Sequence, residues 1–441
     1  MTAATNLHHI IIVGGGAGGL ELATQLGNTL GKQRQASITL VDCTMTHLWK
    51  PLLHEVAAGS LNSYEDELSY MAQAYWHHFK FRLGRMDQLD RKKREISLAP
   101  CLNERGVEFI PRRTFTYDTL IIAVGSITND FNIPGIREHC MFLDTRQEAD
   151  HFHQTLLRNY FAAQTRQRSL REGQLHIAIA GAGATGVELS AELHEATRQI
   201  VEYGLDRINP EAVRITLIDA SDRILSALPE RLSRLTERAL RNIHVEILTG
   251  QRIVKATADG FHTARGLFIP AEIKVWAAGI KAPDFLKDID GLETSSLNQL
   301  VVKPTLQTTR DECIFAFGDC AACPMPGGGI VPPRAQSAHQ QAMLLVKSMK
   351  HRLGNRPLPE YRYVDYGSLI NMSRYSTVGN LMGNLTGKLS GNIMIEGVFA
   401  RLVYLSLYKM HQLALHGVIR VILSTVANML AHRVKPRMKL H

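Results

Sequence analysis

Two stretches of the chain place a short apolar run before a cluster of glycines. Residues 10–19 read IIIVGGGAGG and residues 177–186 read IAIAGAGATG. Each apolar run predicts a buried strand, and the glycines that follow predict a tight turn into a helix. Each helix is followed by a second apolar run that ends in an acid, SITLVD at 37–42 and RITLID at 214–219. The hydrophobic pattern therefore predicts a repeated strand–turn–helix–strand unit.

The repeat extends to a third strand in each half. TLIIAVGS at 119–126 corresponds to IKVWAAGI at 273–280, and both end in a small residue and a glycine. This order predicts an α/β fold with two Rossmann-like domains built on doubly wound parallel sheets. We expect a discontinuous first domain at 1–135 and 281–350, a second at 136–280, and a C-terminal region at 351–441. The longer gap before the second acid predicts an insertion at 203–212.

The glycines follow the spacing G-x-G-x-x-G in both halves, which is typical of a dinucleotide-binding turn. A missing Cβ lets the backbone approach a phosphate, and the helix N-terminus points free N–H groups at the anion. The acid at the end of the next strand is expected to accept hydrogen bonds from ribose hydroxyls. In the second half this acid disfavours a 2′-phosphate, so NADH is preferred over NADPH, although Arg223 could weaken the preference. The residues concerned are Gly14, Gly16, Gly19 and Asp42, then Gly181, Gly183, Gly186 and Asp219.

Composition limits the class of protein. The chain has 441 residues, of which 45% are hydrophobic and 21% charged, as in an ordinary globular protein. Six cysteines are too sparse for a disulfide scaffold, so we expect reduced thiols. No metal-ligand cluster is evident. The N-terminal apolar run is too short for a signal peptide, and no window reaches the roughly 20 apolar residues of a spanning helix.

The net charge of +9 comes mostly from the end of the chain, where no Asp or Glu follows Gly397. This distribution does not indicate nucleic-acid binding. Residues 399–416 and 418–432 are amphipathic, and basic residues follow them. The pattern predicts helices that lie in the headgroup plane of anionic lipid. A helical hairpin packed on the core, or a dimer interface, is the alternative. The marker residues are Tyr404, Tyr408, Arg420, Ser424, Asn428 and His432.

Residues 309–320 read TRDECIFAFGDC. This stretch resembles the one that closes the FAD domain of flavoproteins of the disulfide-reductase type, in which the aspartate, here Asp319, holds the ribityl chain. The first half of the repeat therefore resembles an FAD site, and the second takes the nicotinamide nucleotide. Relatives that reduce disulfides carry a cysteine pair beside the flavin, where this chain has single cysteines. Cys320 and Cys323 follow the Gly-Asp turn, and a buried role is favoured over a redox or metal-binding role.

A proline- and glycine-rich loop leads into a predicted helix that begins near Ala335 and aims its N-terminus at the flavin. Gln336 and Gln340 lie on one face of it, and their amides suit a quinone carbonyl. The motif Ala335-Gln336-x-Ala338-x-Gln340 resembles the quinone-site signature of type II (non-proton-pumping) NADH:quinone oxidoreductases. The resemblance extends over the whole chain, including PLLHEVAAGSL, GATGVELSAEL and SLYKMHQLALHG, and the chain is close to the bacterial members.

The resemblance implies roles for individual residues. Glu188, Gln336 and Gln340 would be catalytic, although Glu188 could simply be an acid in the first turn of its helix. Quinone could receive its proton from water, from His339 or through Glu188. Lys50 could reach the flavin or lie on the surface, and Met86, near the end of a probable third strand, could contact adenine through its backbone. Tightly bound FAD would be held by Gly14, Gly16, Gly19, Asp42, Asp319, Ala335 and Gln336, and NADH by Gly181, Gly183, Gly186, Glu188, Asp219, Ala278 and Gly279.

The sequence thus predicts a peripheral enzyme that oxidises NADH and reduces ubiquinone or menaquinone through FAD, without pumping protons. We expect it on the cytoplasmic face of the inner (cell) membrane, with a homodimer left open. Alternatives are a sulfide:quinone oxidoreductase-like enzyme, which needs paired cysteines at the flavin, and a soluble NADH-dependent flavoprotein reductase. A non-catalytic NADH-sensing protein would bind the nucleotide without turnover.

Overall fold

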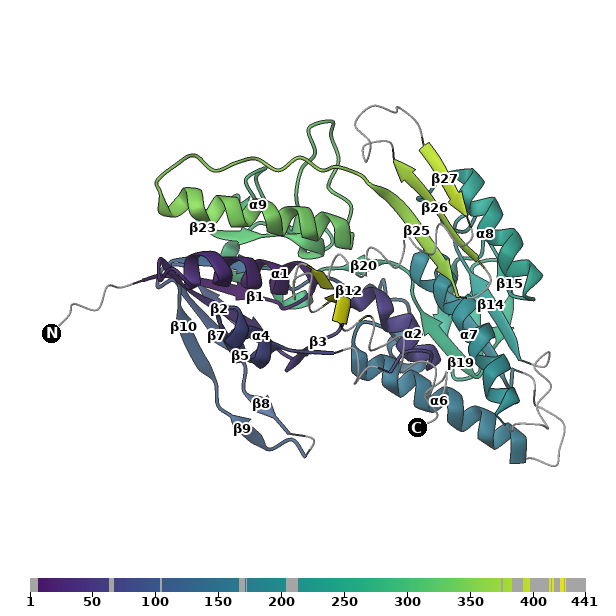
Figure 1. Cartoon of the computed structure of the whole chain (residues 1–441). Coiled ribbons are helices and arrows are strands. Elements are labelled where there is room, and N and C mark those ends of the chain that lie inside the picture. The colour runs from purple at the N-terminus through teal and green to yellow at the C-terminus, as the bar shows by residue number, and fades with distance from the viewer. Residues whose placement is uncertain are drawn as a thin grey trace. The chain divides into compact units, whose positions relative to one another are not determined.

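The computed structural model describes residues 7–62, 67–103, 105–165, 171, 173–203, 213–373, 376–382 and 392–396, together with 412–413, 415, 421–423 and 425. The chain forms two compact units (Figure 1). Unit 1 comprises Met1–Trp49, Glu67–Ile127 and Ile280–Val364, and unit 2 comprises Lys50–Asp66, Thr128–Gly279 and Asp365–His441. Residues 365–441 thus group with unit 2, and the three-part division expected from the sequence stays a prediction.

Unit 1 is built on a six-stranded sheet in the order β22-β23-β11-β1-β2-β5. All neighbours are parallel except β22, which runs antiparallel to β23. Ile10, Ile11 and Ile12 of the central strand are fully buried, as expected for a parallel strand covered on both faces. The strands are β1 (His8–Val13), β2 (Ala36–Asp42), β5 (Lys80–Leu83), β11 (Thr119–Ile122), β22 (Gln307–Thr308) and β23 (Asp311–Ala316).

Three helices accompany this sheet: α1 (Ala17–Leu26), α4 (Tyr70–Trp76) and α9 (Ala335–Leu353). Helices α1 and α9 pack against each other, and α4 packs on β5. Short elements complete the unit: η1 (Gly27–Gly31), β3 (Thr46–His47), β4 (Leu68–Ser69), β6 (Met86–Asp90), β7 (Glu95–Leu98), β8 (Cys101–Leu102), β9 (Glu108–Ile110), β10 (Arg113–Thr116), β20 (Ile280–Lys281), η4 (Asp284–Leu286), η5 (Ile289–Gly291), β21 (Leu300–Val301), η6 (Gly318–Cys320) and β24 (Ala321–Ala322); β12 (Ile127–Thr128) lies at its boundary.

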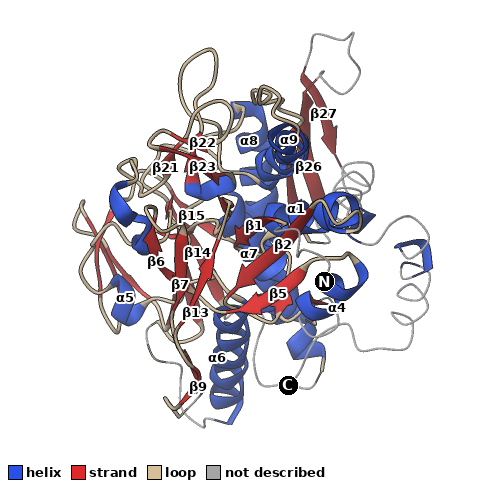
Figure 2. Ribbon diagram, turned by 90° about the vertical axis from the view of Figure 1, so that its left-hand side faces the viewer, coloured by secondary structure: helices blue, strands red, loops and turns tan. Residues whose placement is uncertain are grey.

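Unit 2 has a four-stranded parallel sheet in the order β15-β14-β13-β19, of which Figure 2 labels β13, β14 and β15. Its strands are β13 (His176–Ala180), β14 (Arg214–Ile218), β15 (Glu246–Leu248) and β19 (Ile273–Trp276), and β16 (Ile253–Ala256), β17 (Gly260–Thr263) and β18 (Phe268–Pro270) form a smaller sheet. A third sheet consists of β25 (Gly367–Met372), β26 (Ser376–Met382) and β27 (Asn392–Glu396). The helices are η2 (Lys50–Leu52), α2 (Leu53–Ala58), α5 (Ile136–His139), α6 (Arg146–Thr165), α7 (Ala184–Glu202) and α8 (Glu230–Asn242).

The two large sheets repeat the same arrangement, which confirms the predicted fold class. In each unit, the strand before the glycine turn lies between the strand that ends in the acid and the third strand of the repeat. The registers correspond, because Ile10 pairs with Thr119 in unit 1 and Ile177 pairs with Ile273 in unit 2.

The C-terminal prediction lies almost wholly outside the described residues. Of 399–432, only 412–413, 415, 421–423 and 425 are described, and these are helical. Of the insertion expected at 203–212, only Tyr203 is described. In the described parts of the chain, no helix combines the length and the apolar character needed to cross a membrane.

Candidate functional site

The glycine turn of unit 1 joins β1 to α1 and is packed tightly except at its centre. A Cβ on Gly14, whose φ is +102°, would lie 2.3 Å from the carbonyl oxygen of Ala123, and one on Gly19 would meet the carbonyl of Gly14. At Gly16 a Cβ would meet no atom within 4 Å. The outer glycines are therefore required by the fold, whereas the central one leaves the backbone open to a ligand.

The turn of unit 2 has the same construction. Gly181 has a φ of +103°, and a Cβ there would lie 2.7 Å from the backbone of Ala277. A Cβ on Gly186 would meet the carbonyl of Gly181, and Gly183 again faces open space. Helices α1 and α7 begin directly after the open glycines. Each unit therefore aims an open backbone and the positive end of a helix at the same point, which suits an anion.

The acids at the ends of β2 and β14 hold these turns in place. A carboxylate oxygen of Asp42 accepts the N–H of Gly15 at 2.6 Å, and one of Asp219 accepts the N–H of Ala182 at 2.6 Å. The second oxygen of Asp219 accepts the N–H of Ser221 at 2.7 Å. A carboxylate has further lone pairs, so the expected ribose contacts remain compatible with these bonds.

Three further residues were predicted to affect or form the nucleotide site of unit 2, namely Arg223, Ala278 and Gly279. The guanidinium of Arg223 donates to the backbone oxygens of Leu225, at 3.2 Å, and Ser226, at 2.6 Å, which fixes it near the chain that follows β14. At the end of β19, Ala278 is half-buried and Gly279 has a φ of +71°. Gly125, at the matching position of unit 1, has a φ of +69°.

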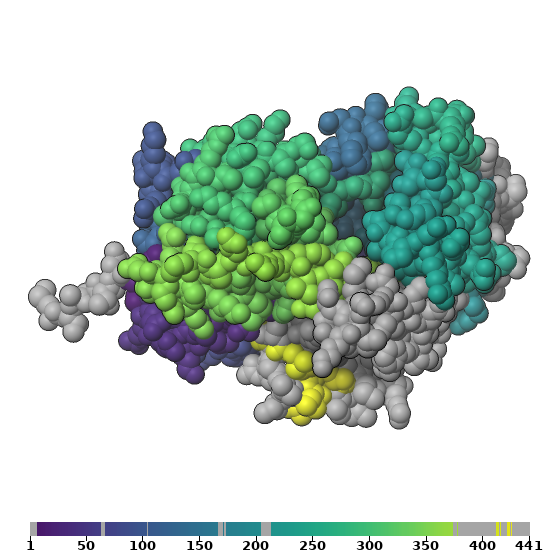
Figure 3. All heavy atoms as spheres, turned by 90° about the horizontal axis from the view of Figure 1, so that it is seen from above, coloured from purple at the N-terminus to yellow at the C-terminus, as the bar shows by residue number. Residues whose placement is uncertain are grey.

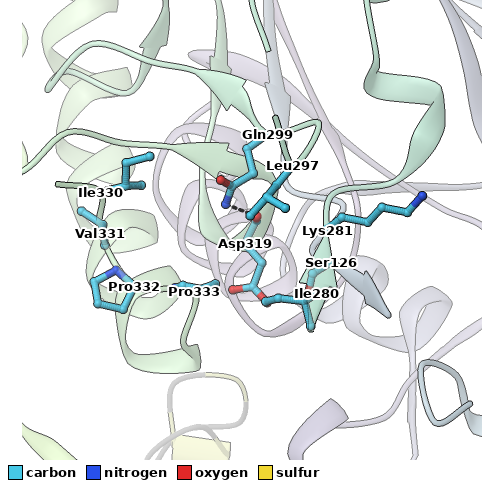
Figure 4. A pocket seen from close by; sticks show the side chains of 10 residues that line it. All are labelled: Ser126, Ile280, Lys281, Leu297, Gln299, Asp319, Ile330, Val331, Pro332 and Pro333. Carbon is cyan, nitrogen blue, oxygen red and sulfur yellow. Dashed lines mark hydrogen bonds between the residues drawn. The ribbon is translucent and has the colours of Figure 1, made fainter. Parts of the chain in front are cut away.

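Asp319 lies after β23 and lines a pocket of unit 1 with Ser126, Gln299 and other residues (Figure 4). The hydroxyl of Ser126 donates to the Asp319 carboxylate at 2.8 Å, and the side-chain amide of Gln299 donates to the Asp319 backbone oxygen at 3.0 Å. The carboxyl edge of a doubly wound sheet is where such folds bind ligands. The sequence analysis missed Ser126, although it follows the glycine of the repeated third strand.

Helix α9 begins at Ala335, as predicted. Gln336 is half-buried in its first turn. The amide of Gln340 donates to the backbone oxygen of Val364 at 2.8 Å, and its oxygen accepts the N–H of Val364 at 3.1 Å and the hydroxyl of Tyr361 at 3.3 Å. Gln340 therefore fastens the segment 354–364, which crosses the outer surface of unit 1 in yellow-green (Figure 3). No sequence pattern indicated this contact, because Val364 lies beyond the end of the helix.

Glu188 lies in the first turns of α7, against α2 and β25. Its carboxylate accepts the N–H of Asn371 at 3.0 Å and lies 3.9 Å from Nδ1 of His54. Burial is the main cause that raises the pKa of Glu188 to about 8; the carboxylates of Glu55 and Glu192 act in the same direction, and the bond from Asn371 acts against them. Burial lowers the pKa of His54 to about 4, so this imidazole supplies no positive charge. Glu188 is thus a neutral acid near pH 7.

Comparison with known proteins agrees with this geometry. Residues 8–342 match the pyridine nucleotide-disulphide oxidoreductase family. A type II NADH:quinone oxidoreductase of Haemophilus influenzae is 42% identical over 99% of this chain and 100% of its own length. The chain belongs to the family of type II NADH:quinone oxidoreductases, as the sequence predicted.

The fold is shared with more distant structures. A structure of NDH2 from Plasmodium falciparum in complex with NADH covers 98% of this chain and 100% of its own, with a TM-score of 0.83 at 18% identity. A sulfide:quinone oxidoreductase from Aquifex aeolicus covers 93% of this chain and 92% of its own, with a TM-score of 0.70 at 16% identity. At these identities the likeness concerns the fold alone.

The two cysteines that follow the Gly-Asp turn do not suit thiol chemistry. Cys320 and Cys323 are buried, and burial raises their pKa values to about 12 and about 11. The thiol of Cys320 lies 3.3 Å from the backbone oxygen of Phe317. A thiol held protonated is a poor nucleophile, so the structure supports the buried role that the sequence favoured.

Lys50 and Met86 were both predicted to contact the flavin cofactor. Lys50 lies in unit 2 and pairs with Asp144 at 3.0 Å. The strand beside β2 is β5, which ends at Leu83, and Gly84 then turns the chain with a φ of +157°. Met86 is buried at the start of β6, three residues beyond the end of β5 and so near the place expected. Its contact with adenine stays a prediction.

Proposed function

We propose that the resident cofactor is FAD and that it is held by unit 1. The turn at 14–19, Asp42, Asp319 and the Ala335–Gln336 step would hold it. Bound there, FAD supplies a carrier that accepts a hydride and passes on two electrons. The open centre at Gly16, where a side chain would meet nothing within 4 Å, fits a pyrophosphate lying directly on the backbone. Ser126 and Gln299 would keep Asp319 oriented toward the ribityl chain.

NADH would occupy the matching turn of unit 2. The open backbone at Gly183 and the N-terminus of α7 suit its pyrophosphate, and Asp219 suits a ribose with a free 2′-hydroxyl. The neutral Glu188 would lie at the nicotinamide end together with Ala278 and Gly279. A protonated carboxyl there can donate a hydrogen bond without placing a negative charge in the site.

The quinone would be received at the start of α9. Gln336 can donate a hydrogen bond to a quinone oxygen, and Gln340 would keep the segment around Val364 closed over the helix. Lys50 and Met86 remain proposed flavin contacts. Residues 399–441 would bind anionic lipid at the cytoplasmic face of the membrane, and a homodimer is compatible with this arrangement.

The single observation that carries the proposal is the pair of matched glycine turns, each open only at its central glycine. The test is to extract the flavin from the purified protein and identify it, then to mix the protein anaerobically with NADH, NADPH or sulfide. We expect FAD, and rapid bleaching by NADH alone. FMN as the extracted flavin, or bleaching by sulfide and not by NADH, would contradict the proposal.

A further inference from the structure

Helix α4 exposes its apolar side chains. Its buried positions are Tyr70, Gln73 and Ala74, which face unit 1. Its exposed positions include Met71, at 60% exposure, and Tyr75, at 84%. These two residues are four apart and share one face of the helix. A surface helix usually carries polar residues on that face, so the pattern is the reverse of the ordinary one.

Two further exposed apolar residues belong to the same region. Met45 is 54% exposed, and its backbone oxygen accepts the N–H of Tyr70 at 3.1 Å. Trp76, at the end of α4, is 47% exposed. We call Met45, Met71, Tyr75 and Trp76 the α4 patch. The patch is firmly attached, because the hydroxyl of Tyr70 donates to the backbone oxygen of Gly15 at 2.7 Å.

Cations flank the α4 patch. Helix α4 packs on β5, the edge strand of the sheet, where Lys80 and Arg82 are exposed (Figure 2). Arg85 follows and is exposed as well. The sequence contains no Asp or Glu from residue 68 to residue 86. The patch therefore combines tyrosine, tryptophan and methionine with a stretch of chain whose charged side chains are positive.

We propose that the α4 patch rests on the surface of an anionic lipid bilayer. It would be a second membrane contact, in addition to the one proposed for residues 399–441. Tyrosine and tryptophan favour the boundary between headgroups and acyl chains, and nearby cations attract anionic headgroups. A second copy of the chain is a poorer occupant, because two patches brought face to face would place like charges together. Quinones dissolve in lipid, so a lipid-facing surface on unit 1 shortens the path of a quinone from the bilayer to the flavin. This advantage rests on the proposed function.

Vesicle binding of the full-length protein tests the proposal. Met71→Ser with Tyr75→Ser should weaken partitioning onto vesicles of phosphatidylcholine and phosphatidylglycerol several-fold. Lys80→Gln with Arg82→Gln should weaken it about fivefold for each charge removed, and only when phosphatidylglycerol is present. Phe109→Ser is the matched control, because Phe109 is 58% exposed on β9. The ferricyanide reductase rate with NADH should be unchanged in every variant, which confirms an intact fold.

Tryptophan fluorescence gives a second, direct readout. The chain has three tryptophans, and bromine-labelled phosphatidylcholine should quench the emission of the one in the α4 patch. Trp76→Phe should remove most of that quenching. Unchanged quenching, or partitioning lowered equally by Phe109→Ser, would overturn the proposal. A change of sedimentation coefficient without a change in vesicle binding would also overturn it and assign the patch to a second copy. All these readouts are independent of quinone reduction, so they can fail while the proposed function stands.

Discussion

Replacing Glu188 by glutamine should stabilise the protein at alkaline pH and change little at acidic pH. Glutamine has the shape of a protonated glutamic acid, and its oxygen can still accept the N–H of Asn371. The substitution removes a buried carboxyl group that loses its proton at alkaline pH. The neutral imidazole of His54, 3.9 Å away, offers no compensating charge in the native protein.

The size of the effect follows from the pKa of Glu188, which burial raises from 4.5 to about 8. A pKa difference of one corresponds to about 1.4 kcal/mol. Ionising Glu188 in the folded protein therefore lowers the free energy of unfolding by roughly 4 to 5 kcal/mol at most. Below pH 4.5 the group is protonated in both the folded and the unfolded chain, and it contributes nothing. As the pH rises from 4.5 to 8 only the unfolded chain loses the proton, so the free energy of unfolding falls. Above pH 8 the whole cost is present.

The assay is thermal unfolding of wild type and Glu188→Gln across this range of pH. The gain in Tm should be small near pH 4.5 and should grow up to about pH 8. Glu230→Gln is the control, because it makes the same substitution on α8 at a side chain that is 65% exposed. A Tm difference for Glu188→Gln that does not change with pH would refute the reasoning, since it would mean that Glu188 is not buried as a neutral acid.

Three further outcomes are expected. Gly16→Ala should lower the flavin content of the purified protein without lowering the Tm of the apoprotein. Gly19→Ala should lower the Tm of the apoprotein, because its Cβ would lie 1.9 Å from the carbonyl oxygen of Gly14. Equal losses of Tm in the two variants would contradict the interpretation that only Gly16 faces open space. Asp219→Asn should raise the KM for NADH by about tenfold or more, since a charge-assisted hydrogen bond contributes about 1.5–3 kcal/mol, and should narrow the preference for NADH over NADPH. Steady-state kinetics with both nucleotides checks this, and an unchanged ratio of their kcat/KM values would contradict it. Cys320→Ala with Cys323→Ala should leave kcat with a soluble quinone nearly unchanged, and a loss of NADH-driven turnover at full flavin content would restore a redox role to these thiols.

Much of the fold could be predicted because its signals are local. Each apolar run before a glycine turn became a central parallel strand, and Ile10–Thr119 and Ile177–Ile273 pair as the internal repeat required. The glycine spacing also succeeded, since φ values near +100° at Gly14 and Gly181 exclude most other residues. The start of α9 at Ala335 followed from the proline-rich loop before it.

The parts that escaped prediction depend on contacts between distant segments. Gln340 was expected at an acceptor site, yet its amide also binds Val364, which no helical periodicity indicates. The exposed face of α4 was overlooked, since in a helix of seven residues the apolar pattern does not distinguish the inner from the outer side.

Two glutamates show how far a repeat determines chemistry. Glu21 follows Gly19 by the same spacing as Glu188 follows Gly186, so both lie at the same position on the helix after a glycine turn. In unit 1, Glu21 accepts a hydrogen bond from His339 at 2.8 Å, and that bond raises the pKa of the histidine. In unit 2, the corresponding histidine neighbour, His54, is buried and neutral, and Glu188 holds the proton instead. The duplicated backbone fixes where each carboxyl lies, but a distant segment decides its histidine partner: His339 donates a hydrogen bond to Glu21, whereas the histidine beside Glu188 is buried and neutral.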